Sequence, residues 1–212
     1  MKNLYYISIE GVIGVGKTSL ALLLGERLKA RVVLEKFEEN PFLEDFYKDP
    51  KRYAFQTQIY FLLSRYRQQQ ELLQVDLFHK LLITDYMFVK DKLFANLNLS
   101  DKELTLYNTI VSLLEKNIPK PDLAIYLQSS TYRLMENIKK RKRYFEENIT
   151  REYIESLNQV YNNFFFKYQD SPLLIINTTE IDFVRNFQEL EDLIAQIRKP
   201  IKGTKFYNPK GL

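Results

Sequence analysis

The chain of 212 residues is 45% hydrophobic, carries a net charge of +4 at pH 7 and contains no cysteine. This length and apolar content suit one α/β domain with a substantial core. The absence of cysteine excludes disulfides, thiol catalysis and cysteine-based zinc sites. No run of about 18 apolar residues occurs, so we predict no membrane span. The positive charge is too weak and dispersed to indicate nucleic-acid binding, although it suits anionic ligands.

The first motif along the chain is a glycine-rich loop. Residues 11–18 read G-V-I-G-V-G-K-T, which fits the phosphate-binding pattern G-x-x-x-x-G-K-[ST]. A short apolar run, 4–9, precedes the loop, and a segment with helical spacing, 19–28, follows it. In such loops backbone N–H groups surround phosphate oxygens, the lysine reaches the β- and γ-phosphates, and the hydroxyl binds Mg²⁺. The alternative is a plain turn between strand and helix. We predict a nucleotide site formed by Gly11, Gly14, Val15, Gly16, Lys17, Thr18 and Ser19, with Thr18 also a metal ligand.

Short apolar runs then alternate with longer helical segments. Such runs are typical of strands buried on both faces, and the alternation predicts an α/β fold with a parallel sheet of about five strands flanked by helices. Ligands bind beyond the carboxyl ends of such strands. The basic segment 199–212 contains several Pro and Gly residues, so we expect a loosely ordered tail after a single domain, 1–198. The expected strands lie at 4–9, 31–34, 81–84, 122–127 and 173–176.

Two carboxylates follow predicted strands. Glu35 comes after the second strand, where it could accept a proton from an acceptor hydroxyl or be a solvated acid in a Glu-rich loop. Asp85 ends the third strand, where it could hold Mg²⁺ or its waters, or cap the next helix. Position alone leaves both pairs of alternatives open.

The densest basic cluster is Lys139-Lys-Arg-Lys-Arg143. Its arginines could stabilise charge on a transferring phosphoryl group. Alternatively, the cluster is a solvated helix end, where cations are favoured, or a nucleic-acid patch, which no aromatic interleaving supports. His79, the one histidine, belongs to no catalytic motif, so we do not expect histidine chemistry.

Five segments in order resemble the deoxynucleoside kinases, most closely the bacterial deoxyguanosine/deoxyadenosine kinase branch. The resemblance spans about residues 3–195. It implies a P-loop kinase fold with a helical, arginine-rich lid. The matching segments are 9–18 (I-E-G-x-I-G-x-G-K-[ST]), 35–47 (E-x-x-x-[DE]-N-P-[YF]-L-x-x-[FY]-Y), 53–65 (the substrate-pocket helix), 121–127 (P-D-[LV]-x-I-Y-L) and 141–157 (the lid and its helix).

The resemblance also implies residue roles. Glu35 would take the proton from the nucleoside 5′-OH, Tyr47 and Glu146 would hold the 3′-OH, and Gln58 would hydrogen-bond the base. Arg65 would lie at the rim of the base pocket and orient Glu35 or the base. The implied substrate site is Glu35, Tyr47, Gln58, Arg65, Asp85 and Glu146; the catalytic groups are Glu35, Lys17, Arg141 and Arg143; the metal ligands are Thr18 and Asp85.

The chain departs from the family pattern at several positions. Asp85-Tyr86-Met87 stands where the family usually has an acid, an arginine and a serine, which removes an arginine; the bacterial deoxyguanosine kinase branch also tends to carry Asp-Tyr. Lys142 replaces the middle glycine of the lid, and Asn137 replaces an arginine. A one-residue gap leaves the match of Asp91 to a base-contacting acid open.

These features predict a cytoplasmic deoxynucleoside kinase that uses ATP and Mg²⁺, with purine deoxynucleosides as first substrates and deoxycytidine also possible. The resemblance alone implies a homodimer. A nucleoside monophosphate kinase of the thymidylate kinase type would need an arginine within 35–47, where this chain is acidic and aromatic. A regulatory P-loop module such as a GTPase would need D-x-x-G and N-K-x-D motifs, which do not occur.

Overall fold

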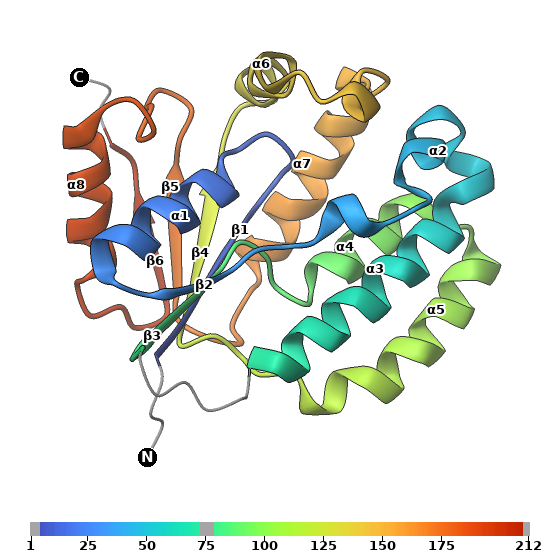
Figure 1. The fold of residues 1–212 in the computed structure, drawn as a ribbon, viewed down its shortest axis with the longest axis horizontal. Helices are drawn as coiled ribbons and strands as arrows, with labels where there is room; N and C mark the ends of the chain where they lie inside the picture. Colours follow the sequence, from blue (N-terminus) through green and yellow to red (C-terminus); the bar gives the residue numbers. More distant parts are fainter. Residues whose placement is uncertain (1–4, 73–78, 210–212) are drawn as a thin grey trace.

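A computed structural model describes residues 5–72 and 79–209, and its centre is a parallel sheet (Figure 1). The strand order is β2-β3-β1-β4-β5-β6, and every pairing is parallel. The predicted α/β class is confirmed, with six strands rather than about five. The strands are β1 (Tyr5–Gly11), β2 (Arg31–Val33), β3 (Leu81–Thr84), β4 (Leu123–Gln128), β5 (Leu173–Asn177) and β6 (Thr204–Tyr207). Leu4, where we expected the first strand to begin, lies outside the described residues.

The sixth strand comes from the segment that we expected to be loosely ordered. Residues 204–207 pair with β5, with Leu173 opposite Thr204 and Ile176 opposite Tyr207. This strand is at the sheet edge, and its side chains alternate between exposed and half-buried. For residues 204–207 the expectation was wrong, because the breakers flank the strand and do not interrupt it. Residues 210–212 of the same tail lie outside the described residues.

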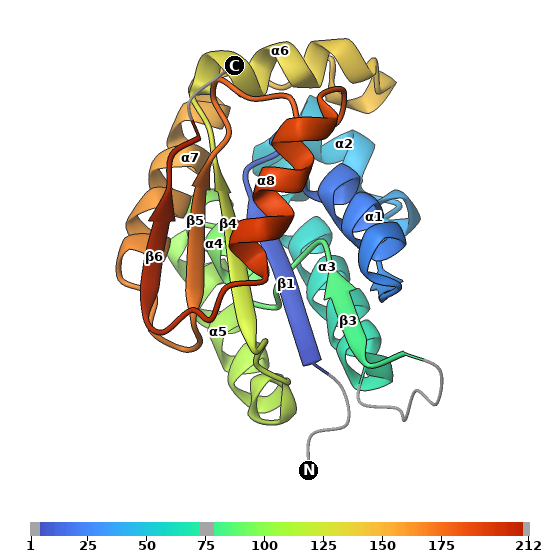
Figure 2. The ribbon, with the colours of Figure 1, turned by 90° about the vertical axis from the view of Figure 1, so that its left-hand side faces the viewer.

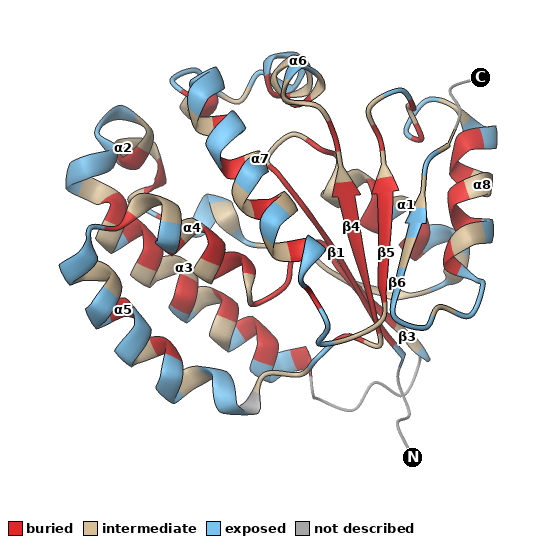
Figure 3. Cartoon of the chain, turned by 180° about the vertical axis from the view of Figure 1, so that it is seen from behind, coloured by how far each residue is buried: buried red, intermediate tan, exposed pale blue. Residues whose placement is uncertain are grey.

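Helices cover both faces of the sheet, which is why the central strands are apolar along their length. Figures 1 and 2 show α1 (Lys17–Leu28) and α8 (Phe187–Ile197) on one face. The other face carries α3 (Pro50–Leu72), α4 (Lys90–Asn98), α5 (Asp101–Leu114) and α7 (Arg151–Phe166). Strands β1, β4 and β5 are buried almost throughout, whereas α5 has an exposed outer face (Figure 3).

A second apolar cluster lies away from the sheet, among α2 (Leu43–Lys48), α3, α4 and α5. Phe46, Leu62 and Tyr107 are buried in it. A capping box between Ser100 and Glu103 begins α5, which satisfies backbone N–H groups at the helix start. This cluster fixes α3 beside the sheet, so that one face of α3 lies next to the strand ends.

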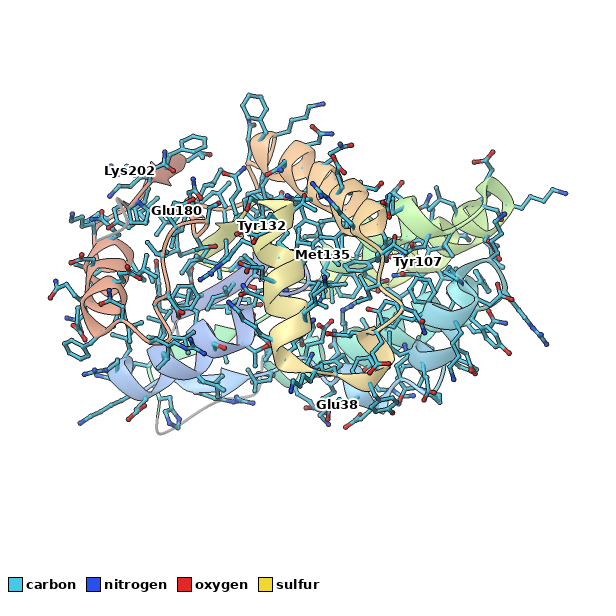
Figure 4. All side chains as sticks on the ribbon, turned by 90° about the horizontal axis from the view of Figure 1, so that it is seen from above. Glu38, Tyr107, Tyr132, Met135, Glu180 and Lys202 are labelled. Carbon is cyan, nitrogen blue, oxygen red and sulfur yellow. The ribbon has the colours of Figure 1, made fainter. Side chains whose placement is uncertain are left out.

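Helix α6 (Thr131–Arg141), which leads into the predicted lid segment 141–157, crosses the molecule above the carboxyl ends of the strands, as Figure 4 shows from above. We call α6 together with the turn that follows it, 131–146, the lid. Glu38, in the 3₁₀ turn η1 (Phe37–Glu39), lies near the turn η3 (Tyr144–Glu146) that follows α6. A further turn, η2 (Glu115–Asn117), follows α5. No helix of the described ranges is long and apolar enough to cross a membrane.

Candidate active site

Two cavities meet at the carboxyl ends of the strands. All six predicted substrate residues line the first one: Glu35, Tyr47, Gln58, Arg65, Asp85 and Glu146. The second is lined by residues 14–19 of the P-loop, by the lid and by the loop that follows β5. Lys17, Thr18, Arg141 and Arg143 line both cavities. Two ligands in these cavities would therefore meet above the P-loop.

The P-loop takes the conformation that its glycines permit. Gly14 and Gly16 have φ of 88° and 102°, which other residues rarely adopt. A Cβ on Gly14 would lie 2.8 Å from the carbonyl oxygen of Leu134 in α6, so the loop packs directly against the lid. Gly11 lines neither cavity; a Cβ there would lie 2.6 Å from the carbonyl oxygen of Leu127, so close packing against β4 requires its glycine.

Lys17 turns back onto its own loop in this structure. Its ammonium donates to the carbonyl oxygens of Gly11 at 2.7 Å and of Val12 at 3.2 Å. Burial and the nearby Lys90 lower the pKa of Lys17 to about 8, although Glu10 and Glu35 act in the opposite direction. An anionic ligand would restore the usual preference for the charged form.

Thr18 and Asp85 face each other beside the P-loop. The Thr18 hydroxyl donates to Asp85 Oδ2 at 2.5 Å, and Asp85 Oδ1 accepts from the backbone N–H of Glu35 at 2.7 Å. Burial raises the pKa of Asp85 above its usual value. The helix-cap alternative for Asp85 is wrong, because α4 begins five residues later with Val89 as its N-cap.

This oxygen pair fits the chemistry of Mg²⁺, which binds one or two protein oxygens and completes its shell with waters and substrate phosphates. In the parts of the chain that the structure describes, no three His, Cys, Asp or Glu side chains gather into a metal cage. Such a cage suits a metal held by protein alone, and a nucleotide-bound Mg²⁺ does not need it.

Glu35 is an internal carboxylate and not a solvated loop acid. Its side chain is 10% exposed. Arg65 donates to Oε1 through Nε at 2.8 Å and Nη2 at 2.6 Å, and the Lys90 ammonium contacts Oε2. Burial alone would raise the pKa of Glu35, but Lys90 and Arg65 outweigh it and lower the pKa to about 2. The carboxylate is thus held ionised beside Lys17 and Asp85.

Gln58 and Arg65 lie on the buried face of α3, seven residues apart and therefore about two helical turns from each other. Gln58 is 3% exposed, so it is not a surface glutamine. Its amide donates to the backbone carbonyl of Asp91 at 2.8 Å. The Asp91 carboxylate is fully buried and accepts hydrogen bonds from Arg65 and from Tyr107. Asp91 does not line the first cavity and instead supports the two α3 side chains that do.

The lid brings only part of the basic cluster to the site. Arg141 donates to Glu146 through Nε and Nη2, both at 2.6 Å, and Arg143 lies 3.6 Å from the same carboxylate. Lys139 and Lys140 are exposed. The guanidinium of Arg143 also lies 4.3 Å from the centre of the Phe37 ring. The ring of Phe145 stacks on that of Tyr47 at 6.5 Å.

Three residues that depart from the family pattern, Tyr86, Asn137 and Lys142, play different parts in the structure. Tyr86 is fully buried and lines neither cavity, so it does not replace the lost arginine. Asn137 donates to the Gly14 carbonyl at 2.9 Å and ties α6 to the P-loop. Lys142 ends α6 in a left-handed conformation with φ of 50°.

Sequence reasoning missed several residues of the site. Arg133 in α6 and Phe183 in the loop after β5 line the second cavity. The one signal for each was its place shortly after a predicted strand, the fourth strand for Arg133 and the fifth for Phe183. Lys90 lines the first cavity and was also missed. Its one signal was its place at the start of a helix shortly after the third strand.

Comparisons with known proteins agree with this geometry. Residues 7–202 match the family described as deoxynucleoside kinase. The chain is 34% identical to the deoxyguanosine kinase of Bacillus subtilis, over 95% of this chain and 100% of that protein. It is 35% identical to the deoxyadenosine kinase of Dictyostelium discoideum, over 96% and 82% of the two chains. A structure of deoxyadenosine kinase from M. mycoides with bound dATP superposes with a TM-score of 0.81 at 27% identity, over 92% of this chain and 100% of that one. The chain therefore belongs to the deoxynucleoside kinase family.

Proposed function

We propose that this protein transfers the γ-phosphoryl group of ATP to the 5′-OH of a deoxynucleoside. The observation that carries the proposal is the position of Glu35, a buried carboxylate on the wall of one cavity, close to the P-loop where the second cavity begins. The first cavity would take the deoxynucleoside and the second the nucleotide.

In the proposed step, Glu35 accepts the proton of the 5′-OH while the 5′-oxygen forms a bond to the γ-phosphorus. The bond from that phosphorus to the β,γ-bridging oxygen breaks, and its electron pair leaves with ADP. Lys17, Arg141 and Arg143 stabilise charge on the phosphates, since all three line both cavities. Thr18 and Asp85 would hold Mg²⁺, which neutralises phosphate charge when bound.

The acceptor residues support a deoxynucleoside with a free 3′-OH. The Gln58 amide can pair with a base edge because it offers both donors and an acceptor. Tyr47 and Glu146 line the same cavity and would hold the 3′-OH. Purine deoxynucleosides are the preferred acceptors in our proposal, because the relatives compared above are deoxyguanosine and deoxyadenosine kinases.

The kinetics of a Glu35→Gln variant test this role. We expect kcat to fall by roughly 10²-fold or more, the usual scale for a positioned base, with little change in deoxynucleoside affinity. Glu38→Gln is the matched control, since Glu38 is an exposed acid of the same loop (Figure 4). If Glu35→Gln keeps kcat and loses only binding, Glu35 is not the base.

We also propose a cytoplasmic homodimer that acts in nucleoside salvage. The outer face of α5 exposes Leu106 and Leu113, which are 53% and 71% accessible and two helical turns apart. An apolar pair on one helix face is suited to a partner surface. A Leu113→Glu variant should sediment as a monomer if this face forms the dimer; an unchanged dimer would place the interface elsewhere.

A further inference from the structure

Lys90 is a buried cation at the catalytic junction that neither the motifs nor the family roles account for. It is the first residue of α4 and is 7% exposed. Its ammonium contacts Glu35 Oε2 and lies 5.8 Å from the centre of the Phe94 ring. Burying an ammonium is costly unless anions compensate it. Its place on the cavity wall beside Lys17 and Asp85 therefore suggests a use.

The two cations on Glu35 differ in how firmly they are fixed. Arg65 spans two carboxylates, Glu35 and the fully buried Asp91, so its guanidinium is held from both sides. Lys90 contacts only Glu35 among the acids of the described residues. An ammonium on a flexible stem can also exchange one oxygen partner for another without the fixed geometry that a guanidinium imposes. Lys90 is therefore the cation that is able to turn to a ligand.

Charge balance changes at this point during phosphoryl transfer. Before the reaction Glu35 neutralises Lys90. Once Glu35 holds the acceptor's proton, it no longer does so, and a phosphoryl group with negative oxygens has arrived on the 5′-oxygen. Lys17, Arg141 and Arg143 line both cavities, whereas Lys90 lines the acceptor cavity and not the nucleotide cavity. Lys90 therefore places a cation on the acceptor side beside the two acids, Glu35 and Asp85, that the new phosphate would approach.

We propose that Lys90 is the acceptor-side ligand of the transferred phosphoryl group and binds the 5′-phosphate of the product. This inference rests on the proposed function and adds a phosphate subsite to it. Tyr86, which stands where the family pattern has an arginine, is uncharged and buried away from the cavities. Lys90, four residues further on, supplies a cation to the same cavity.

Binding of product and acceptor by a Lys90→Met variant tests the subsite without turnover. Isothermal titration calorimetry, without nucleotide, would measure Kd for deoxyguanosine and for deoxyguanosine 5′-monophosphate, with the deoxyadenosine pair in parallel. We expect the monophosphate to bind about 10- to 100-fold more weakly, the scale of one charged hydrogen bond. The nucleoside should change by less than about threefold, and Lys90→Arg should recover part of the monophosphate affinity.

Lys92→Met is the matched control, because Lys92 lies in the same helix but is half-exposed and paired with Glu115 outside both cavities. It should bind both ligands as the wild type does. Steady-state assays should show that Lys90→Met lowers kcat while KM for the nucleoside changes little. Lys90→Gln, which keeps a donor without the charge, gives the same test if the methionine variant does not fold.

Equal loss of nucleoside and monophosphate affinity would overturn the inference, because Lys90 would then only shape the pocket around Glu35. Unchanged monophosphate affinity would overturn it too. Failure of the proposed function is a separate result: the wild-type protein would then phosphorylate no nucleoside at all, whatever the variants bind.

Discussion

The charge state of Glu35 is set by the side chains that surround it. Two cations contact its two oxygens, and burial strengthens these interactions because water screens them less. The carboxylate is therefore ionised and oriented before any acceptor arrives. If Glu35 is the base, as we propose, it must exchange at least one of these two cation contacts for a contact with the acceptor hydroxyl.

The depressed pKa of Glu35 predicts how stability depends on pH. The pKa falls from an ordinary 4.5 to about 2 in the folded protein, because Lys90 and Arg65 outweigh burial. The folded state thus binds fewer protons than the unfolded one, so this contribution is present above pH 4.5 and is lost as pH falls toward 2. Thermal melts should show wild type and Glu35→Gln converging in Tm across that window. A constant difference in Tm would contradict the assignment.

A Tyr47→Phe variant tests whether the Tyr47 hydroxyl binds the 3′-OH of the sugar. The Tyr47 ring stacks on Phe145, so Tyr47→Phe keeps this packing and removes only the hydroxyl. We expect deoxynucleosides to lose about 0.5–1.5 kcal/mol in kcat/KM, the scale of one hydrogen bond. Substrates without a 3′-OH should lose less, so discrimination against 2′,3′-dideoxynucleosides should shrink. Equal losses for both substrate types would mean that the hydroxyl acts through packing.

At the scale of elements, the site depends on loops that rigid neighbours position. Helix α6 lies against the P-loop through Gly14 and Asn137, and η3 lies against α2 through Phe145 and Tyr47. The lid thus contacts both cavities. Among the described residues from the start of α6 to the end of η3, Lys142 alone has a positive φ, and its left-handed conformation ends α6.

Replacing Lys142 by glycine should relieve this conformation. A left-handed residue that is not glycine costs roughly 1–2 kcal/mol. Since 1 kcal/mol shifts Tm by about 2–4 °C in a chain of this size, Lys142→Gly should raise Tm by about 2–8 °C. Lys29 provides a matched control, since it ends α1 with φ of 52°. Lys29→Gly should raise Tm similarly and leave kinetics unchanged, whereas Lys142→Gly should also alter KM for ATP. A lower Tm for both variants would contradict the backbone argument.

Much of the fold was predictable because its signals are local. The P-loop follows from eight consecutive residues, and the central strands follow from apolar runs. Strand β6 was not predictable, because Thr204–Tyr207 is a half-exposed edge strand among breakers. The contact of Lys90 with Glu35 was not predictable either, because it joins residues 55 positions apart through the packing of α4.

At the scale of the whole molecule, two cavities share one wall, and the fold explains their position. Parallel strands direct the P-loop, Glu35 and Asp85 to the same edge of the sheet. The second apolar cluster, among α2, α3, α4 and α5, fixes α3, and α3 carries Gln58 and Arg65 to this same edge of the sheet. The exposed face of α5 lies on the outer side of the second apolar cluster, away from the two cavities (Figure 3).

The central claim is tested most directly by following the γ-phosphoryl group of labelled ATP. The purified protein with Mg²⁺ would be incubated with four deoxynucleosides, their 5′-monophosphates, 2′,5′-dideoxyadenosine or no acceptor, and the products separated. We predict labelled 5′-monophosphate from deoxyguanosine or deoxyadenosine, and no transfer to 2′,5′-dideoxyadenosine, which lacks the 5′-OH. Lys17→Ala should lose this transfer and remain folded. Label in diphosphates, or release of phosphate that is independent of any nucleoside, would contradict the account.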